Sequence, residues 1–405
     1  MSLTGTTKSI EYIEQENQYG AHNYHPLDVV CTRGSGVHLT DVDGKQYMDF
    51  LAAYSAVNQG HNHPKIAAAM IKQIQTLALT SRAFRNDQFP PLLEKLCKVT
   101  GFEKALLMNS GAEAVETAIK AMRKWAYDVK GIAPGQAEII VAEGNFHGRT
   151  TTIIGFSTDP DSTTGFGPFT PGFKIVPYGD LAAVAAAITP NTAAIFMEPI
   201  QGEGGVLIPP AGFLQGLRKL ADQNNCLLVL DEIQSGFGRT GKMFAFEHEG
   251  IRPDGITVGK ALSGGFYPVS AFLSSAAIMD VFTPGIHGST YGGNPLACAV
   301  ASAALDVLLD EKLVERSAEL GKHFKARLEG IKSSKIKAIR CRGLWAGIDL
   351  TEDAGPAKSY CYALKDRGML CKDTHVRTIR LAPPLVITQE QIDWAVDQLE
   401  AVLGE

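Results

Sequence analysis

Two short apolar runs, each ending beside one reactive side chain, constrain the fold most strongly. Residues 227–230 lead directly into Asp231, and residues 256–258 lead into Lys260 two positions later. A short apolar run bounded by turn residues is typical of a buried strand. In parallel sheets, ligands bind beyond the carboxyl ends of the strands. The sequence therefore predicts a parallel sheet with a carboxylate and an amine at one edge.

The surroundings of Lys260 favour a reactive amine. It is a lone lysine in an apolar, glycine-flanked stretch, where desolvation would lower its pKa and make it a candidate Schiff-base amine. Taken singly, Asp231 could cap a helix or form a salt bridge, and Lys260 could be a solvated loop lysine. Taken together, they indicate pyridoxal phosphate, which needs an amine for its aldehyde and a carboxylate to keep its ring nitrogen protonated.

Residues 236–242 contain a second pattern, GFGRTGK, which fits the dinucleotide fingerprint G-x-G-x-x-G and nearly fits a phosphate-binding loop. The position that needs a magnesium-binding hydroxyl is Met243. Residues 244–250 are too short and too poor in helix signals for the helix that either motif requires. We therefore interpret this stretch as a loop without a nucleotide.

Composition excludes several classes of protein. The chain has 405 residues with 45% hydrophobic content, which suffices for a large core, and its net charge of -5 without basic runs disfavours nucleic acid and anionic membranes as partners. Its seven cysteines are scattered and suit a reducing compartment. We see no apolar run near the roughly 20 residues that span a bilayer and no targeting segment, so we expect a cytoplasmic protein.

Strand and helix signals alternate along the middle of the chain. A strand at residues 105–108 is followed by a turn and then by a helix, where Ser110 and Glu113 form a capping box. Gly111 would also let backbone N–H groups approach a phosphate at this helix N-terminus. Further strands at residues 139–142 and 193–197 precede polar segments. This alternation predicts an α/β fold with a mostly parallel central sheet covered by helices on both faces.

The ends of the chain suggest additional parts. Residues 36–47 alternate around Asp43-Gly44, which predicts a hairpin. We expect an N-terminal segment (1–50) that packs with a small domain, a large cofactor-binding domain (51–295) and a smaller C-terminal α+β domain (296–405). The last helix should begin with a capping box of Thr388 and Gln391. His61 and His63 could form a metal pair, but no third ligand lies nearby, so we expect ordinary turn histidines and no metal site.

These motifs resemble the class III, fold-type I aminotransferases that use pyridoxal 5'-phosphate. The stretches DEIQ at 231–234 and GKAL at 259–262 carry the resemblance to the class. Three further stretches are similar to the ornithine δ-aminotransferase family: YGAHNYHP at 19–26, YSAVNQGH at 54–61 and RLAPPL at 380–385. The resemblance covers most of the chain.

The resemblance implies a set of cofactor contacts. Lys260 would bind the cofactor covalently and shuttle a proton, Asp231 would pair with the pyridinium nitrogen, and Gln234 would hydrogen-bond the ring hydroxyl. Phe146 would stack on the ring. Ser289 and Thr290 would reach the phosphate of the neighbouring subunit, so that a homodimer shares its active sites. The full implied cofactor set is Ser110, Gly111, Ala112, Phe146, His147, Asp231, Gln234, Lys260, Ser289 and Thr290.

The resemblance also implies the substrates, ornithine and 2-oxoglutarate. Tyr24 and Arg149 would bind the α-amino and α-carboxylate groups of ornithine, so that the δ-amine reaches the cofactor, and Tyr54 would line the pocket. Arg380 would bind the α-carboxylate of glutamate or 2-oxoglutarate, and Glu203 would shield it during the first half-reaction. On physical grounds we expect a bidentate ion pair between the two, because such a contact is strong enough to choose between substrate orientations. Gly204 departs from the alanine usual in that family and adds backbone freedom beside Glu203.

Several alternatives stay open at this point. Acetylornithine and 4-aminobutyrate aminotransferases share the lysine, aspartate and phosphate motifs, although Tyr24 and Tyr54 favour ornithine. A nucleotide-binding protein would use residues 236–242, and a non-catalytic carrier would hold the cofactor without turnover. If these residues had only structural roles, Phe146 would be an ordinary core aromatic, and Arg149 and Arg380 would form surface ion pairs.

Overall fold

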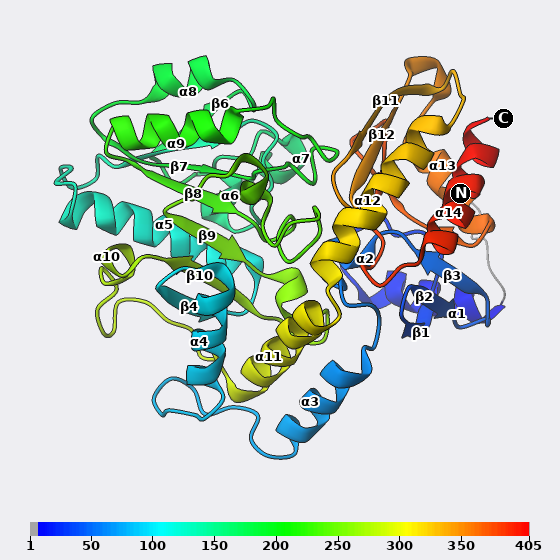
Figure 1. Ribbon diagram of the computed structural model, residues 1–405, viewed down its shortest axis with the longest axis horizontal. Coiled ribbons are helices and arrows are strands. Elements are labelled where there is room, and N and C mark those ends of the chain that lie inside the picture. Colours follow the sequence, from blue (N-terminus) through cyan, green and yellow to red (C-terminus); the bar gives the residue numbers. More distant parts are fainter. Residues whose placement is uncertain (1–6, 405) are drawn as a thin grey trace.

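The structure is a computed structural model that describes residues 7–404. It contains a large sheet-based part and a smaller part, and helices α11 (Pro295–Asp310) and α12 (Leu313–Gly330) run from the first to the second (Figure 1). In the described residues, no helix combines the length and apolar content needed to cross a membrane.

The large part is built on a seven-stranded sheet of order β4-β10-β9-β8-β7-β5-β6. In this spatial order the strands are β4 (Lys104–Met108), β10 (Ser270–Ser274), β9 (Gly255–Val258), β8 (Leu227–Asp231), β7 (Thr192–Met197), β5 (Glu138–Ala142) and β6 (Phe173–Val176). The five strands from β9 to β6 are parallel, and β10 is antiparallel to both β9 and β4. The prediction of a mostly parallel sheet is confirmed.

Side chains on the two faces of the sheet enter separate cores. On β8, Leu228 and Leu230 point into one core, while Leu227 and Val229 point into the other, as the alternation of a strand requires. Helix α9 (Phe213–Gln223) covers the first core, and α5 (Gly111–Asp128) covers the second (Figure 1). The sheet is therefore buried on both faces, which explains its continuous apolar runs.

Further elements lie in the large part or at its border with the smaller part. They are α2 (Ala52–Ser55), α3 (Pro64–Ile74), α4 (Phe89–Thr100), α6 (Thr151–Ile154), α7 (Pro160–Thr163), α8 (Leu181–Ala187), α10 (Ala276–Met279) and the 3-10 turns η1 (Ala245–Glu249) and η2 (Lys260–Ser263). The α11 residues Leu296, Val300 and Leu308 are buried in the core on the α9 side of the sheet.

The smaller part has an antiparallel sheet of order β11-β12-β15-β14. Its strands are β11 (Ile336–Cys341), β12 (Ala346–Leu350), β15 (Thr378–Leu381) and β14 (Lys372–Thr374), and its other helical elements are η3 (Glu352–Ala354), α13 (Ala357–Asp366) and α14 (Gln389–Leu403). Thr388 and Gln391 form the predicted capping box at the start of α14.

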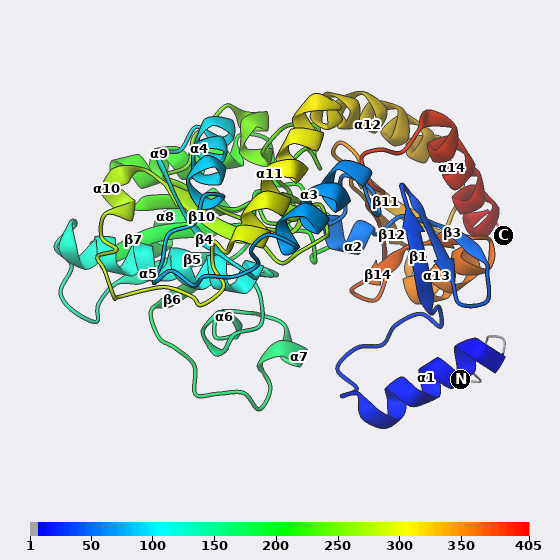
Figure 2. The same cartoon turned by 90° about the horizontal axis from the view of Figure 1, so that it is seen from below.

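The N-terminal strands lie beside this smaller part. Strands β1 (Cys31–Ser35), β2 (His38–Asp41) and β3 (Gln46–Asp49) form a sheet with β13 (Met369–Leu370), which runs parallel to β3. The antiparallel pairing of β2 and β3 confirms the predicted hairpin. Helix α1 (Thr7–Tyr19) lies outside this sheet and away from the seven-stranded sheet (Figure 2).

Candidate active site

The parallel strands bring their polar segments to one edge of the large sheet. Strands β8 and β9 pair in register, with Asp231 opposite Thr257. Because β7 and β5 run in the same direction, the residues that follow them reach the same edge. These segments enclose a cavity of about 200 Å³, which is lined by Gly111, Ala112, Phe146, His147, Gly148, Glu198, Ile200, Asp231, Ile233, Gln234, Ser235 and Lys260.

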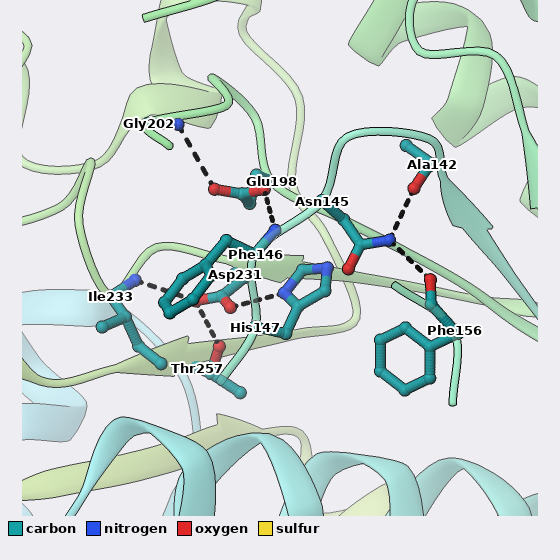
Figure 3. A network of polar contacts seen from close by, with 10 residues as sticks. All are labelled: Ala142, Asn145, Phe146, His147, Phe156, Glu198, Gly202, Asp231, Ile233 and Thr257. Atoms are coloured by element: carbon teal, nitrogen blue, oxygen red, sulfur yellow. Dashed lines mark hydrogen bonds and ion pairs between the residues drawn. The ribbon is translucent and has the colours of Figure 1, made fainter. Parts of the chain in front are cut away.

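Asp231 is the best-connected carboxylate of this cavity. Its Oδ1 accepts hydrogen bonds from Ile233 N at 3.1 Å and Thr257 Oγ1 at 2.9 Å, and its Oδ2 lies 2.7 Å from His147 Nδ1 (Figure 3). Both Asp231 and His147 are buried. A buried carboxylate held by three partners keeps one orientation, as a partner for a ring nitrogen must.

Lys260 faces the same cavity from the segment after β9. Its backbone φ of 46° lies in the left-handed region that non-glycine residues seldom adopt. Such strain is concentrated at functional sites. Burial lowers the pKa of the Lys260 amine, with the nearby Arg380 acting in the same direction and Glu203 opposing it. The predicted lowering of its pKa is therefore confirmed.

The N-terminus of α5 forms another wall of the cavity. Ser110 caps the helix by accepting a hydrogen bond from Glu113 N at 3.2 Å, which confirms the predicted capping box. The first N–H groups of a helix have no partner within it, so those of Gly111 and Ala112 are oriented to bind an anion. A Cβ at Gly111 would lie 3.1 Å from Ile233 Cδ1, and glycine therefore keeps this wall open.

The predicted residue Arg380 lies beside this cavity on β15. It is buried, and its Nη1 donates to Glu203 Oε1 at 2.8 Å. Its guanidinium carbon lies 4.8 Å from the centre of the Tyr54 ring. The expected bidentate ion pair is wrong, because only Nη1 reaches Glu203 while Nη2 is buried without a partner among residues 7–404. The guanidinium can thus bind a further acceptor.

Arg149 and Tyr24 lie at the outer side of the site. Arg149 Nη1 donates to Tyr24 Oη at 3.0 Å, although the two residues are 125 positions apart in sequence. A second cavity of about 440 Å³ is lined by Arg149, Phe146 and Glu203 among others. It shares Phe146 and His147 with the first cavity, so Arg149 and the Arg380 partner Glu203 both line a space that adjoins it.

Of three further predicted cofactor residues, one lines the first cavity and two do not. Gln234 lines the first cavity, and its Nε2 donates weakly to Tyr54 O at 3.4 Å and to Glu203 Oε1 at 3.5 Å. Ser289 Oγ accepts a hydrogen bond from Asn109 Nδ2 at 2.9 Å, and Thr290 is exposed. Neither Ser289 nor Thr290 lines the first cavity of its own chain.

Glu198 is a site residue to which the sequence analysis gave no role. Its Oε2 accepts a hydrogen bond from Phe146 N at 3.0 Å and its Oε1 one from Gly202 N at 3.4 Å (Figure 3). Burial raises the pKa of its carboxyl to about 7. Its position directly after β7 was a usable signal, because Asp231 ends the neighbouring strand at the same edge.

The two remaining motifs have structural partners. His61 Nε2 lies 2.7 Å from Asp49 Oδ2, and His63 Nε2 lies 3.3 Å from Glu311 Oε2. In the nucleotide-like loop, Arg239 is fully buried and donates to the carbonyl oxygens of Leu344 and Pro383 at 2.8 and 2.7 Å. The loop is thereby tied to the smaller part, and only the short turn η1 follows it.

Comparisons with known proteins agree with this geometry. A family model described as Aminotransferase class-III matches residues 19–403. The chain is 59% identical to the ornithine aminotransferase of Bordetella pertussis over 389 residues, which are 96% of this chain and 94% of that protein. Among solved structures, the ornithine aminotransferase of Toxoplasma gondii ME49 superposes with a TM-score of 0.96 at 43% identity, covering 99% of this chain and 96% of that chain. The acetylornithine aminotransferase of Elizabethkingia anophelis superposes with a TM-score of 0.88 at 49% identity, covering 98% of each chain.

Proposed function

The chain belongs to the class-III aminotransferases, and on this premise we propose that it transfers the δ-amino group of L-ornithine to 2-oxoglutarate. The products are glutamate-5-semialdehyde, which closes to pyrroline-5-carboxylate, and glutamate. The observation that carries this proposal is a difference in ion pairing between two arginines near the candidate site. Arg380 is paired with Glu203, whereas Arg149 donates to the hydroxyl of Tyr24 and has no carboxylate partner within residues 7–404.

The cofactor is pyridoxal 5'-phosphate, and the residues present fit it. An amine, a buried carboxylate and a helix N-terminus line one cavity, at Lys260, Asp231 and Gly111. When bound, the cofactor supplies an aldehyde that bonds amines and a protonated ring that withdraws electrons. We assign its phosphate to Ser110, Gly111 and Ala112, and its ring to Phe146, His147, Asp231 and Gln234.

The protein's own groups then perform four tasks. Asp231 holds a proton at the ring nitrogen, since a buried carboxylate favours a neighbouring positive charge. Lys260, whose amine has a lowered pKa, holds the cofactor and moves the proton at the reacting carbon. Arg149 and Tyr24 bind the α-carboxylate and α-amino group of ornithine. Phe146 covers the ring face and excludes water.

The second half-reaction needs a different carboxylate site, for which we propose Arg380. Its buried Nη2 has no partner within residues 7–404 and is a ready donor to the α-carboxylate of 2-oxoglutarate. Glu203 covers Arg380 while ornithine binds and must move aside when 2-oxoglutarate arrives. The δ-selectivity thus depends on which arginine is free to bind a carboxylate.

Acetylornithine aminotransferase is the alternative that a specific observation supports, because the chain resembles one solved example at 49% identity. The free α-amine distinguishes the two substrates: ornithine presents it to Tyr24, whereas acetylation would remove its charge. A half-reaction screen tests both readings. Ornithine, acetylornithine and 4-aminobutyrate are added separately to the purified holoenzyme, and the visible band of the cofactor is followed. Fastest loss of the band with acetylornithine would overturn the ornithine assignment.

We also propose a homodimer with shared active sites. Thr290 and Tyr291 are exposed and lie outside the cavity of their own chain. Exposed apolar side chains on α3 and the following segment, Ile71, Ile74, Leu77 and Phe84, supply further surface for a subunit contact. In this arrangement Ser289 and Thr290 reach the phosphate bound by the partner chain.

We place the enzyme in the cytoplasm. All seven cysteines are free, and five of them are buried. Thiols of this kind persist in a reducing compartment. Fractionation of cells that express the native chain tests this placement.

A further inference from the structure

A third cavity, of about 630 Å³, lies between the large and small parts of the molecule. Its walls come from the loop after β8, from helix α12 and from the β11–β12 turn. It shares no lining residue with either cavity of the active site. The cavity is therefore a separate feature that the proposed reaction does not use.

Three glycines allow the backbone segments that form the walls of this cavity to approach one another closely. A Cβ at Gly343 would lie 2.4 Å from Thr240 C, one at Gly321 would lie 2.5 Å from Gly343 C, and one at Gly241 would lie 2.9 Å from Ala318 Cα. Contacts below 3.0 Å with backbone atoms cannot be relieved by a side-chain movement. The three segments can meet this closely only because each contributes a glycine.

Each of these glycines is the sequence neighbour of a cation that lines the cavity. Lys242 follows Gly241, Lys322 follows Gly321, and Arg342 precedes Gly343. None of these three side chains has a hydrogen-bond or ion-pair partner within the described residues 7–404. In a chain with a net charge of -5, the glycine contacts thus gather three unpaired cations around one space.

The other charged groups around the cavity do not neutralise the positive charge of these three side chains. Lys325 lies 3.7 Å from Glu329, which is the one acidic side chain lining the cavity in the described part of the chain. Arg340 is already neutralised by Asp349, with both N–H···O distances at 2.6 Å. The pKa of His248 is lowered, first by burial and then by Arg342 and Lys242, so the positive field extends to the cavity wall.

We propose that this cavity binds a small phosphate-bearing polyanion. Lysine and arginine are the side chains that bind phosphate, and a multiply charged ligand can contact cations from all three walls at once. Recognition runs through side chains rather than through a phosphate loop, because Gly241 N is already bonded to Gly238 O at 3.0 Å.

Calorimetric titration of the holoenzyme with inorganic pyrophosphate tests the proposal at low and at physiological salt. The holoenzyme is used because its cofactor fills the phosphate-binding helix N-terminus. We expect one site per chain and at least a tenfold loss of affinity in the double variant Lys242→Ala/Arg342→Ala. The matched control, Lys219→Ala/Lys332→Ala, removes the same charge from exposed positions that do not line the cavity, and it should bind as the parent does.

Three outcomes would overturn the proposal. The first is no measurable binding of pyrophosphate at either salt concentration. The second is equal loss of affinity in the cavity variant and the control variant, which would indicate a general charge effect. The third is citrate binding as tightly as pyrophosphate, which would show that the cavity selects charge and not phosphate. If the double variant is unstable, the charge reversal Lys322→Glu at an exposed position replaces it, with the same expected loss.

Discussion

Oε1 of Glu203 lies 2.8 Å from Nη1 of Arg380, and the second terminal nitrogen of that guanidinium is buried without a partner among residues 7–404. Arg380 is 2% exposed, whereas the Glu203 side chain is 31% exposed. The carboxylate can therefore turn toward solvent while the arginine stays in place. A single contact is easier to break than the bidentate pair expected from sequence, which suits the displacement that we propose for Glu203.

Replacing Glu203 by alanine should let ornithine bind in the reversed orientation. Arg380 would then be free to hold the α-carboxylate of ornithine, and the α-amine would reach the cofactor. A change of about 1.4 kcal/mol in the free-energy difference between the two binding orientations corresponds to a tenfold change in the ratio of products. We expect α-transamination and the half-reaction with glutamate both to increase. Product analysis measures the cyclic imine from δ-transfer against the 2-oxo acid from α-transfer. An unchanged ratio in a folded variant would falsify the switch.

Replacing Lys260 by alanine should abolish covalent attachment of the cofactor and nearly all turnover. Loss of a positioned acid–base group alone costs roughly 10²–10⁴-fold in rate. Borohydride reduction followed by peptide mapping identifies the labelled lysine in the parent enzyme. The variant Lys242→Ala, in the loop after β8, serves as the control and should keep the label. A label on any lysine other than Lys260 would reject the assignment.

Replacing Tyr24 by phenylalanine should weaken ornithine binding selectively. The change removes the hydroxyl that accepts from Arg149 Nη1 at 3.0 Å. A hydrogen bond contributes about 1 kcal/mol, so KM for ornithine should rise by roughly fivefold, while KM for 2-oxoglutarate stays constant. Steady-state kinetics with each substrate varied in turn measures the effect. The control is Tyr19→Phe, at an exposed position in α1. Equal changes in both KM values would contradict the assignment.

The buried carboxyl of Glu198 should make stability depend on pH. Its pKa is raised from 4.5 to about 7 in the folded chain, so the folded chain holds this proton more tightly than the unfolded chain does. The resulting contribution to the free energy of unfolding is fully present below pH 4.5 and is lost as the pH rises toward 7. At about 1.4 kcal/mol per pKa unit, the loss is roughly 3 kcal/mol at most. Glu198→Gln removes this titration, so the stability of the variant relative to the parent should increase across this interval. Denaturant unfolding between pH 4.5 and 8 measures the free energy of unfolding of the parent and the variant. If the two free energies change in parallel with pH, the effect is refuted.

Dilution should release cofactor and activity together if the active site is shared between subunits. Dimer dissociation follows mass action, so both losses should depend on protein concentration with the same midpoint. Analytical ultracentrifugation at matched concentrations gives the subunit state. Thr290→Ala should increase cofactor release from the intact dimer. A fully active, cofactor-bound monomer would count against the proposal.

Sequence alone determined the parts of this protein that depend on local patterns. Apolar runs predicted that Asp231 and Lys260 follow two buried parallel strands, because strands of that kind are stable only in a sheet covered on both faces, and the structure shows that these strands are β8 and β9. Ser110 and Glu113 specified the start of α5, because a capping box is satisfied within one helical turn.

Contacts between residues far apart in the sequence follow from the packing of the folded chain. Arg380 meets Glu203 across 177 positions through one nitrogen, and no local pattern carries the number of contacts such a pair makes. The raised pKa of Glu198 follows from its burial, which packing sets and composition does not. The cation-lined cavity exists because Gly241, Gly321 and Gly343 meet from three separate segments. The physical reason is the same in each case: long-range distances and desolvation result from how the elements pack, and a linear pattern does not specify that packing.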